Sequence, residues 1–248
     1  MPSLPSDLID LIDHGDFSQA LIYLHPGMGA KETWSRFPRL LCDELKTSGI
    51  VYTRPEYEDR DGRISLPADF IEREADRLEA LLAEKDVTSA LIVGSSDGAS
   101  IALEHAGRYP KRVRCVVSIA AHVMVDPVMI EALDRLRREA LSEPTPQWLI
   151  SQFGTNGVAT ALAWCKTWKV LMTSGWSMEA RLSAITCPVL AMQGTEDRNG
   201  NLHQLDAIAA NIPDCKVSVL QGLGHFPFRQ EPEKLCIQVA AYVKSHMR

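Results

Sequence analysis

The sequence predicts an α/β protein with a mostly parallel central sheet, helices on both faces and an inserted helical cap. Short apolar runs alternate with longer amphipathic segments along most of the chain, which is the pattern of βαβ units. The short runs are rich in Val, Ile and Leu with little polar alternation, as expected for strands buried on both faces. The alternation stops between residues 123 and 183 and then resumes, which indicates an insertion.

Six apolar runs are the expected strands. They are residues 20–24, 50–54, 90–93, 113–119, 189–193 and 216–220. Two other segments have helical spacing, with apolar residues three or four positions apart. These residues are Ile71, Ala75, Leu78 and Leu82 in one segment and Leu235, Val239 and Val243 in the other. Each set forms one apolar stripe, which we expect to face the sheet.

Residues 123–183 contain no convincing strand, and prolines and glycines interrupt their helix-like segments. Four of the five tryptophans lie in this interval: Trp148, Trp164, Trp168 and Trp176. An aromatic-rich helical insertion between two strands is typical of a lid over a pocket. A plain packing subdomain is the alternative. We therefore predict a core of residues 1–122 and 184–248 and a helical cap of residues 123–183.

Composition limits the classes of function. The 248 residues include 26 Lys and Arg against 32 Asp and Glu, a formal net charge of −6, which argues against nucleic acid as the main partner. No apolar run approaches the roughly 20 residues of a membrane-spanning helix. No Cys–His cluster has zinc spacing. Cysteines in apolar runs and an N-terminus without a signal-peptide pattern predict a reduced, cytoplasmic protein.

The strongest catalytic signal is the sequence GSSDG at residues 94–98, between an expected strand and an expected helix. This is the G-x-S-x-G pattern in the strand-turn-helix context that it requires. The glycines permit a sharp turn that strains the serine backbone, and the helix N-terminus favours developing negative charge. Ser96 is therefore the candidate nucleophile. Ser95, which lacks the paired glycines, is the rival.

A serine nucleophile needs a base, and the base needs an acid that orients it. His225 lies in a loop after the last expected strand, and loops at the carboxyl ends of parallel strands converge on one edge of the sheet. Asp197 follows the preceding expected strand, and its neighbour Glu196 is the rival acid. The order Ser96, Asp197, His225 is the order expected for this architecture.

Acyl transfer also needs two N–H donors for the oxyanion. One is the backbone N–H of the residue after the nucleophile, Asp97. The other is expected from the loop HPGMG at residues 25–29, where Gly27 is the first candidate and Met28 the second. Pro26 has no N–H to donate. A simple tight turn is the alternative interpretation of this loop.

With these motifs assembled, the chain resembles the α/β-hydrolase superfamily over residues 21–34, 90–117 and 187–243. The resemblance implies a mostly parallel sheet with a helical cap inserted before the strand that carries the acid. It also implies that the protein uses neither a metal nor an organic cofactor. Small capped esterases, lactonases and C–C bond hydrolases of bacteria are the members that the chain resembles most.

Carried over by position, the family pattern makes Ser96 the nucleophile, Asp197 the acid and His225 the base. It makes Gly27 and Asp97 the oxyanion donors. The implied reaction is attack by the serine on a carbonyl group, followed by hydrolysis of an acyl-enzyme.

Three features depart from the usual family pattern. The common His-Gly pair is His25-Pro26 here, and the residue after the serine, often apolar or amide-bearing, is Asp97. Antiparallel strands are hard to see in residues 1–18, so we expect that edge of the sheet to be reduced. A carboxylate at position 97 would attract a cationic group such as the amine of an amino-acid ester, unless it turns away to bond the backbone or an arginine.

The sequence thus predicts a serine hydrolase that cleaves a small to medium carboxylic ester, thioester or lactone through an acyl-enzyme on Ser96. The expected substrate contacts are Met28, Asp97, Trp164 and Trp168. One alternative is a C–C bond hydrolase or lyase with the same triad, for which the cap supplies basic residues. Another is a non-catalytic, hydrolase-like binding protein. The expected partner is a small-molecule substrate, and a homo-oligomer is left open.

Overall fold

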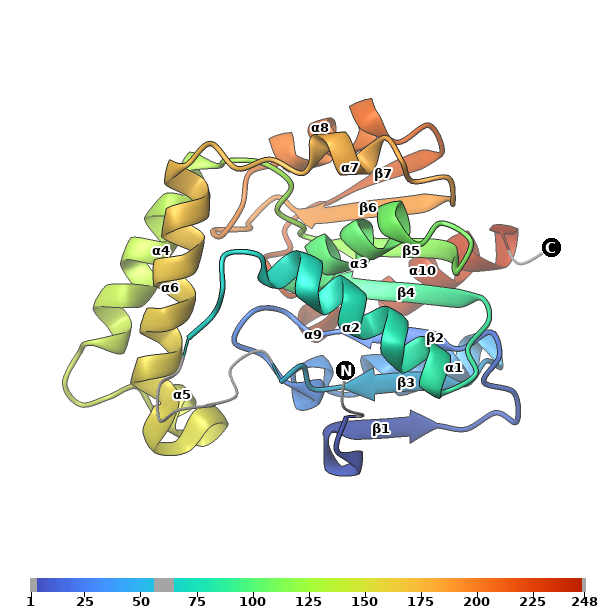
Figure 1. Cartoon of the computed structure of the whole chain (residues 1–248), viewed down its shortest axis with the longest axis horizontal. Helices are drawn as coiled ribbons and strands as arrows, with labels where there is room; N and C mark the ends of the chain where they lie inside the picture. The colour runs from blue at the N-terminus through green and yellow to red at the C-terminus, as the bar shows by residue number, and fades with distance from the viewer. Residues whose placement is uncertain (1–3, 56–64, 247–248) are drawn as a thin grey trace.

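A computed structural model describes residues 4–55 and 65–246 of the chain. Within these ranges, seven strands form one sheet in the order β1-β3-β2-β4-β5-β6-β7. β1 pairs with β3 in antiparallel orientation, and each of the other neighbouring pairs is parallel. Helices cover both faces of the sheet (Figure 1). The predicted α/β class with a mostly parallel sheet is confirmed.

The strands β2 to β7 lie on the six apolar runs expected from the sequence. The strand bounds are β1 (Ile9–Ile12), β2 (Leu21–Leu24), β3 (Gly49–Tyr52), β4 (Ala90–Ser95), β5 (Val113–Ile119), β6 (Val189–Gly194) and β7 (Cys215–Leu220). β1 was not expected, because it is short and mostly exposed and therefore has little apolar signal. The antiparallel edge thus exists as one four-residue strand.

Side chains of the central strands alternate between two apolar layers, as the pleat of a strand requires. Ile22 and Leu24 of β2 pack in the layer with the helices α2 (Phe70–Glu84), α3 (Asp97–Arg108), α7 (Glu179–Leu182) and α8 (His203–Asn211). Leu21 and Tyr23 pack in the other layer, with α1 (Phe37–Leu45), α9 (Pro227–Gln230) and α10 (Pro232–His246). The two predicted apolar stripes lie on α2 and α10 and are buried.

Three further helices stand together at one end of the sheet (Figure 1). They are α4 (Pro127–Ala140), α5 (Gln147–Phe153) and α6 (Gly157–Thr173), all within the interval for which we predicted a cap. α7 belongs to the same interval but packs on the core, where Leu182 is fully buried. Short 3-10 helices, η1 (Ser6–Leu8), η2 (Lys31–Trp34) and η3 (Gly154–Asn156), complete the described elements.

Candidate active site

The turn between β4 and α3 holds Ser96 in a strained backbone conformation. Ser96 has φ 54° and ψ −120°, and a non-glycine residue rarely adopts such a positive φ. The turn requires its glycines, because an added Cβ at Gly98 would overlap the carbonyl of Leu24, and one at Gly94 would overlap the first turn of α3. Ser96 therefore stands at the N-terminus of α3, as the sequence predicted. The rival Ser95 is fully buried within β4.

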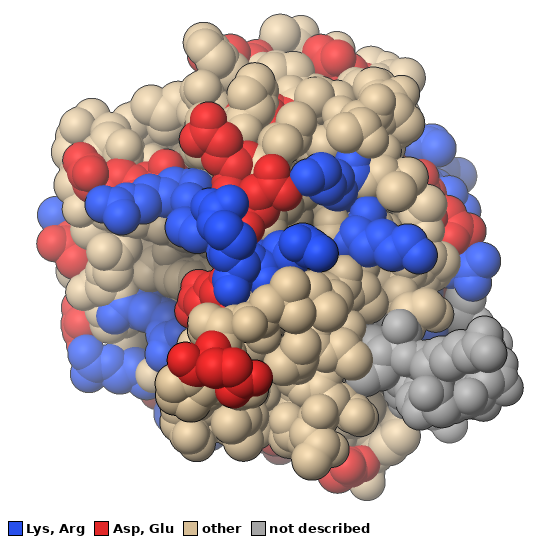
Figure 2. Space-filling model, turned by 90° about the vertical axis from the view of Figure 1, so that its left-hand side faces the viewer, with Lys and Arg blue, Asp and Glu red and all other residues tan. Residues whose placement is uncertain are grey.

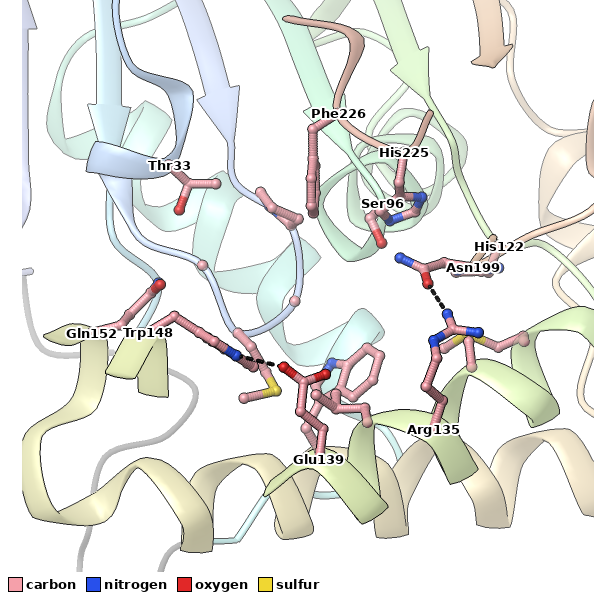
Figure 3. A pocket seen from close by; sticks show the side chains of 18 of the residues that line it. Thr33, Ser96, His122, Arg135, Glu139, Trp148, Gln152, Asn199, His225 and Phe226 are labelled. Carbon is pink, nitrogen blue, oxygen red and sulfur yellow. Dashed lines mark hydrogen bonds between the residues drawn. The ribbon is translucent and has the colours of Figure 1, made fainter. Parts of the chain in front are cut away.

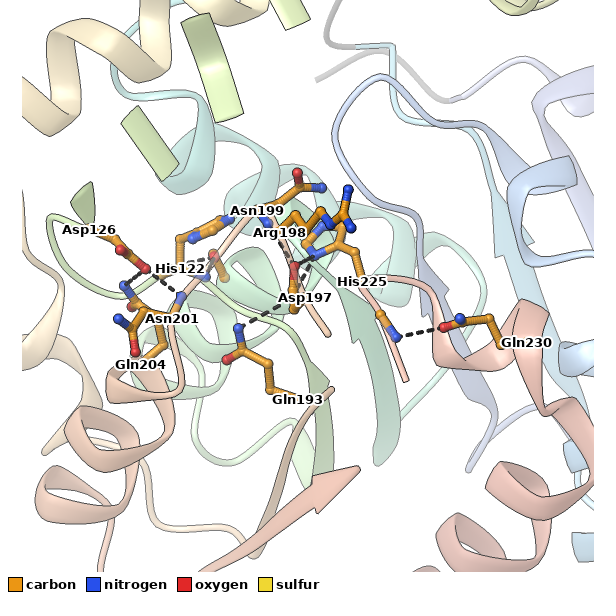
Figure 4. Close-up of polar contacts among 12 residues, drawn as sticks. His122, Asp126, Gln193, Asp197, Arg198, Asn199, Asn201, Gln204, His225 and Gln230 are labelled. Atoms are coloured by element: carbon orange, nitrogen blue, oxygen red, sulfur yellow. Dashed lines mark hydrogen bonds and ion pairs between the residues drawn. The ribbon is translucent and has the colours of Figure 1, made fainter. Parts of the chain in front are cut away.

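His225 and Asp197 form a hydrogen-bonded pair in the loops after β7 and β6 (Figure 4). Nδ1 of His225 lies 2.9 Å from Oδ2 and 3.0 Å from Oδ1 of Asp197. The carboxylate also accepts from the backbone N–H of Asn199 at 2.8 Å and from Gln193 Nε2 at 3.2 Å. The rival acid Glu196 is exposed. The structure therefore places Asp197 as the partner of His225.

The hydrogen bonds at Asp197 keep its carboxyl group charged. Burial raises the pKa of this group, because the side chain is only 1% exposed. The hydrogen bond and charge of His225, together with the N–H of Asn199, outweigh burial and hold the pKa of Asp197 below its usual value. An ionised Asp197 orients the imidazole and would stabilise the imidazolium form.

Ser96 and His225 line one cavity of about 460 Å³, whose wall also includes residues of α4, α5 and α6. Figure 3 shows the two side chains next to each other at one wall. Within the described part of the chain, the hydrogen bonds of the His225 side chain run to Asp197 and none joins it to Ser96. The hydrogen bond between a nucleophile and its base is often long until substrate binds, so its absence does not exclude Ser96 and His225 as such a pair.

The loop at residues 25–29 lies beside Ser96, and Gly27 and Met28 both line the cavity. The buried side chain of His25 holds this loop through two hydrogen bonds. Burial, reinforced by the charge of Arg54, lowers the pKa of His25 well below the usual value, so the ring is neutral. His25 Nδ1 donates to the carbonyl of Pro26 at 2.7 Å, and Nε2 accepts from the backbone N–H of Arg54 at 2.9 Å.

Arg54 is a site residue that sequence reasoning missed. Its buried guanidinium donates to the carbonyls of His25 and Pro26. Arg54 is the last residue of the run predicted as the strand 50–54, so its position at the carboxyl edge of the sheet was the available signal. His25 and Arg54 together hold the loop at residues 25–29, where the usual family pattern is His-Gly and this chain has His25-Pro26.

Two of the four expected substrate contacts line the cavity, namely Met28 and Trp164. Asp97 and Trp168 are completely buried and are not among the cavity-lining residues. The carboxylate of Asp97 accepts hydrogen bonds from Trp164 Nε1 at 2.8 Å and from Trp168 Nε1 at 3.1 Å. Asp97 does turn away from the cavity, but it bonds indole groups, which we had not considered as donors.

His122 is a second histidine in the cavity wall, which the sequence suggests only as a polar residue on the edge of an element. Burial, reinforced by the charge of His225, lowers the pKa of His122 to about 4. Its ring lies 6.4 Å from that of His225, and its buried Nδ1 has no hydrogen-bond partner among the described residues. His122 follows β5 at the carboxyl edge of the sheet, which is the signal that could have identified it.

The loop that carries Asp197 is tied to the start of α4. Asp126 is buried and is the N-cap of α4, where its side chain accepts from the N–H of Val128 at 2.9 Å. The same side chain accepts from the N–H of Asn201 at 2.6 Å (Figure 4). One carboxylate thus joins α4 to the loop of the candidate acid.

Charged residues also face the cavity from α4 and from α9. Arg135 of α4 and Arg229 of α9 line it, as does Glu139, which accepts from Trp148 Nε1 at 2.9 Å. Arg135 Nη2 donates to the side-chain oxygen of Asn199 at 2.9 Å, so its guanidinium is directed toward the loop that carries Asp197 (Figure 3). The side of the molecule formed by α4, α5 and α6 carries a band of Lys and Arg interleaved with Asp and Glu (Figure 2).

The described residues, 4–55 and 65–246, hold neither a metal-type cluster nor a membrane-type helix. No three or more His, Cys, Asp or Glu side chains in these ranges gather as they would around a metal ion. No helix in the same ranges combines the length and apolar character needed to cross a membrane.

Residues 21–238 match the alpha/beta hydrolase family, and the chain belongs to that family. Its fold and the serine turn thus define it as an α/β-hydrolase-type enzyme. A monoacylglycerol lipase of Mycolicibacterium smegmatis is 25% identical over 178 residues, which span 63% of this chain and 62% of that protein. The chain therefore aligns with less than two thirds of this relative.

Solved structures of other hydrolases share the fold. A carboxylesterase structure from the thaumarchaeon Nitrososphaera gargenis has a TM-score of 0.72 at 20% identity and covers 95% of this chain and 94% of its own. A meta-cleavage product hydrolase of Pseudomonas fluorescens has a TM-score of 0.70 at 16% identity and covers 96% of this chain and 93% of its own. At these identities the likeness shows the fold alone.

Proposed function

We propose that this protein is a serine hydrolase that cleaves a small to medium carboxylic ester, thioester or lactone through an acyl-enzyme on Ser96. The observation that carries the proposal is the shared cavity: a strained serine at a helix N-terminus and a histidine paired with a buried carboxylate line the same wall. This arrangement supplies a nucleophile, a base and an orienting acid within one site.

The proposed mechanism follows from these positions. Ser96 Oγ attacks the substrate carbonyl while His225 Nε2 takes the hydroxyl proton, and Asp197 stabilises the imidazolium that forms. The backbone N–H groups of Gly27 and Asp97 hold the oxyanion, and Met28 is the alternative to Gly27. His225 returns the proton to the leaving group. A water molecule, activated by His225, then releases the acid product and restores Ser96.

The cavity wall supports a substrate with apolar character. Met28, Met129, Leu136 and Trp164 contribute apolar surface, and the volume of about 460 Å³ lies within the range of small-molecule sites. The alignment with a monoacylglycerol lipase agrees with an ester substrate. Helices α4, α5 and α6 would form the cap over this cavity, within the proposed boundaries of residues 123–183.

Hydrolysis of a panel of p-nitrophenyl esters and lactones tests the proposal. We expect activity in the wild type and a loss of at least about 10³-fold in kcat for Ser96→Ala, because the nucleophile is removed. A fluorophosphonate probe should label the wild type and not Ser96→Ala, while the matched variant Ser95→Ala should still be labelled. An unlabelled wild type that hydrolyses no member of the panel would contradict the proposal.

One observation favours a second candidate function, a C–C bond hydrolase or lyase with the same triad. Arg135 and Arg229 line the cavity, and such cations could hold an anionic diketone-type substrate. Activity on a dienoate substrate without activity on neutral esters would select this alternative. The reverse result would exclude it.

A further inference from the structure

The side chain of Asp97 lies at the junction of three parts of the proposed site. Asp97 is the first residue of α3, directly after Ser96, and is completely buried. Its Oδ2 accepts from Trp164 Nε1 at 2.8 Å, and its Oδ1 accepts from Trp168 Nε1 at 3.1 Å. Both tryptophans belong to α6. Because they are four residues apart, they lie on the same face of that helix and reach the two oxygens of one carboxylate.

A buried carboxylate depends strongly on its hydrogen-bond donors. If α6 moved away from the core, the carboxylate of Asp97 would lose both indole N–H groups at once. The serine turn and the cap helix therefore stabilise each other through this residue. We call the hydrogen-bonded group of Asp97, Trp164 and Trp168 the indole latch.

The loop that supplies the second proposed oxyanion donor packs directly on the indole latch. An added Cβ at Gly27 would overlap the carboxylate of Asp97 and the Nε1 of Trp164. Only a residue without a side chain can approach the latch so closely. Both proposed oxyanion donors, at residues 27 and 97, thus have their positions set by contact with the same hydrogen bond.

The latch also contacts the histidines of the cavity. The Trp168 ring packs edge-on against His122 at 5.5 Å, and His122 in turn stacks near His225 at 6.4 Å. Trp164 lies 6.4 Å from Trp168 and forms part of the cavity wall. The carboxylate of Asp97 therefore connects helix α6, the cavity wall and the two proposed oxyanion donors.

We propose that the Asp97 side chain is a positioning residue that latches cap helix α6 to the serine turn and thereby sets the oxyanion donors for catalysis. Its kinetic consequence rests on the proposed hydrolase function, whereas the latch itself does not. The carboxylate has this role in place of attracting a cationic substrate group.

Asp97→Asn tests the latch with little change in volume. The amide offers one acceptor oxygen and turns an N–H₂ group toward the other indole N–H, so one of the two hydrogen bonds is lost. We expect kcat to fall about 10- to 100-fold with a smaller change in KM, because oxyanion donors act mainly in the transition state. Trp168→Phe removes the donor instead of the acceptor and should lower kcat in the same direction.

A double-mutant comparison separates the latch from unrelated structural damage. If Asp97 and Trp168 act through their mutual bond, the double variant should lose less kcat than the product of the two single losses. Trp176→Phe is the matched control: Trp176 packs on Trp168 at 5.4 Å but does not donate to Asp97. We expect this control to keep wild-type kcat and KM.

The indole N–H resonances in ¹H–¹⁵N spectra report on the latch without any substrate. Trp164→Phe and Trp168→Phe assign two signals, and Asp97→Asn should shift those same signals. If these signals shift but no substrate is turned over by the wild type, the hydrolase proposal fails and the latch stands. If the wild type is active and Asp97→Asn changes neither the signals nor kcat, the latch is wrong. Loss of a preference for amino-acid esters in Asp97→Asn, with unshifted indole signals, would also overturn it.

Discussion

Two histidines share a wall of the cavity, and their surroundings give them different chemistry. His225 has a carboxylate partner at 2.9 Å, whereas burial lowers the pKa of His122 to about 4 and its Nδ1 has no partner among the described residues. A neutral imidazole can exchange hydrogen bonds with a substrate without competing for the transferred proton. We therefore expect His225 to carry the proton in the proposed reaction while His122 stays neutral.

The depressed pKa of His122 makes folding stability depend on pH. The unfolded chain protonates this histidine near pH 6.5 and the folded protein only near pH 4, so the unfolded state binds more protons between these values. Stability must therefore fall as the pH decreases through this window. The charged groups that face His122 are His225, which lowers its pKa further, and Asp197 and Asp126, which raise it.

We expect His122→Gln to reduce the slope of unfolding free energy against pH by up to about 1.4 kcal/mol per pH unit in this window. Urea unfolding at a series of pH values measures the slope. His203→Gln, on the exposed side of α8, is the control and should leave it unchanged. An unaltered slope in His122→Gln would show that this ring is not the group that titrates.

At the scale of an element, the loop at residues 25–29 depends on a residue from the neighbouring strand. Arg54 follows β3 and donates to two carbonyls of the loop, while neutral His25 links the loop to the backbone of Arg54. Satisfied backbone groups hold the loop in one conformation, which a preorganised oxyanion donor requires. The sequence His25-Pro26-Gly27 stands where a His-Gly turn is more usual, and hydrogen bonds to Arg54, the residue that follows β3 and Thr53, hold it rigid.

Arg54→Lys should lower kcat about 10- to 100-fold and destabilise the fold by about 2 kcal/mol, because an ammonium group cannot reproduce the planar guanidinium contacts to both carbonyls. Ester hydrolysis and urea unfolding measure the two effects. Arg39→Lys, at an exposed position on α1, is the matched control and should leave both unchanged. Wild-type kcat in Arg54→Lys would show that the guanidinium of Arg54 is not needed to position the loop.

At the scale of the whole molecule, charge is distributed unevenly. The chain has a net charge of −6, yet the face formed by α4, α5 and α6 presents a band of Lys and Arg interleaved with acidic groups (Figure 2). Arg135, Arg137 and Arg138 of α4 are exposed, and Arg135 also lines the cavity. A cation at the cavity wall favours substrates that carry a negative group away from the scissile bond.

Arg135→Gln should raise KM about tenfold for an anionic ester such as p-nitrophenyl hemisuccinate and leave KM for p-nitrophenyl butyrate unchanged. Arg137→Gln on the same helix does not line the cavity and is the matched control. The difference between the two esters should shrink at high salt. Equal effects on both esters would mean that Arg135 shapes the cavity and does not recognise charge.

Much of this site could be predicted from the sequence because its signals are local. Gly94 is required because the backbone of the first turn of α3 passes close to it, and Gly98 because the backbone at the end of β2 does; both requirements are visible in the sequence as a spaced motif. Asp197 and His225 each follow a strand, and parallel strands bring such loops to one edge. The short strand β1 escaped prediction because its mostly exposed residues carry too weak an apolar pattern.

Local signals in the sequence by themselves determined the fold class, the strained serine and the loops that face it, because strand periodicity and glycine geometry act over a few residues. Only the tertiary structure decided the partners of Asp97, since Trp164 and Trp168 lie 67 and 71 residues away along the chain. It likewise decided that Arg54 supports the loop at residues 25–29 and that burial lowers the pKa of His122. Hydrogen bonding and burial between distant segments leave no periodic trace, so only the packed chain could show them.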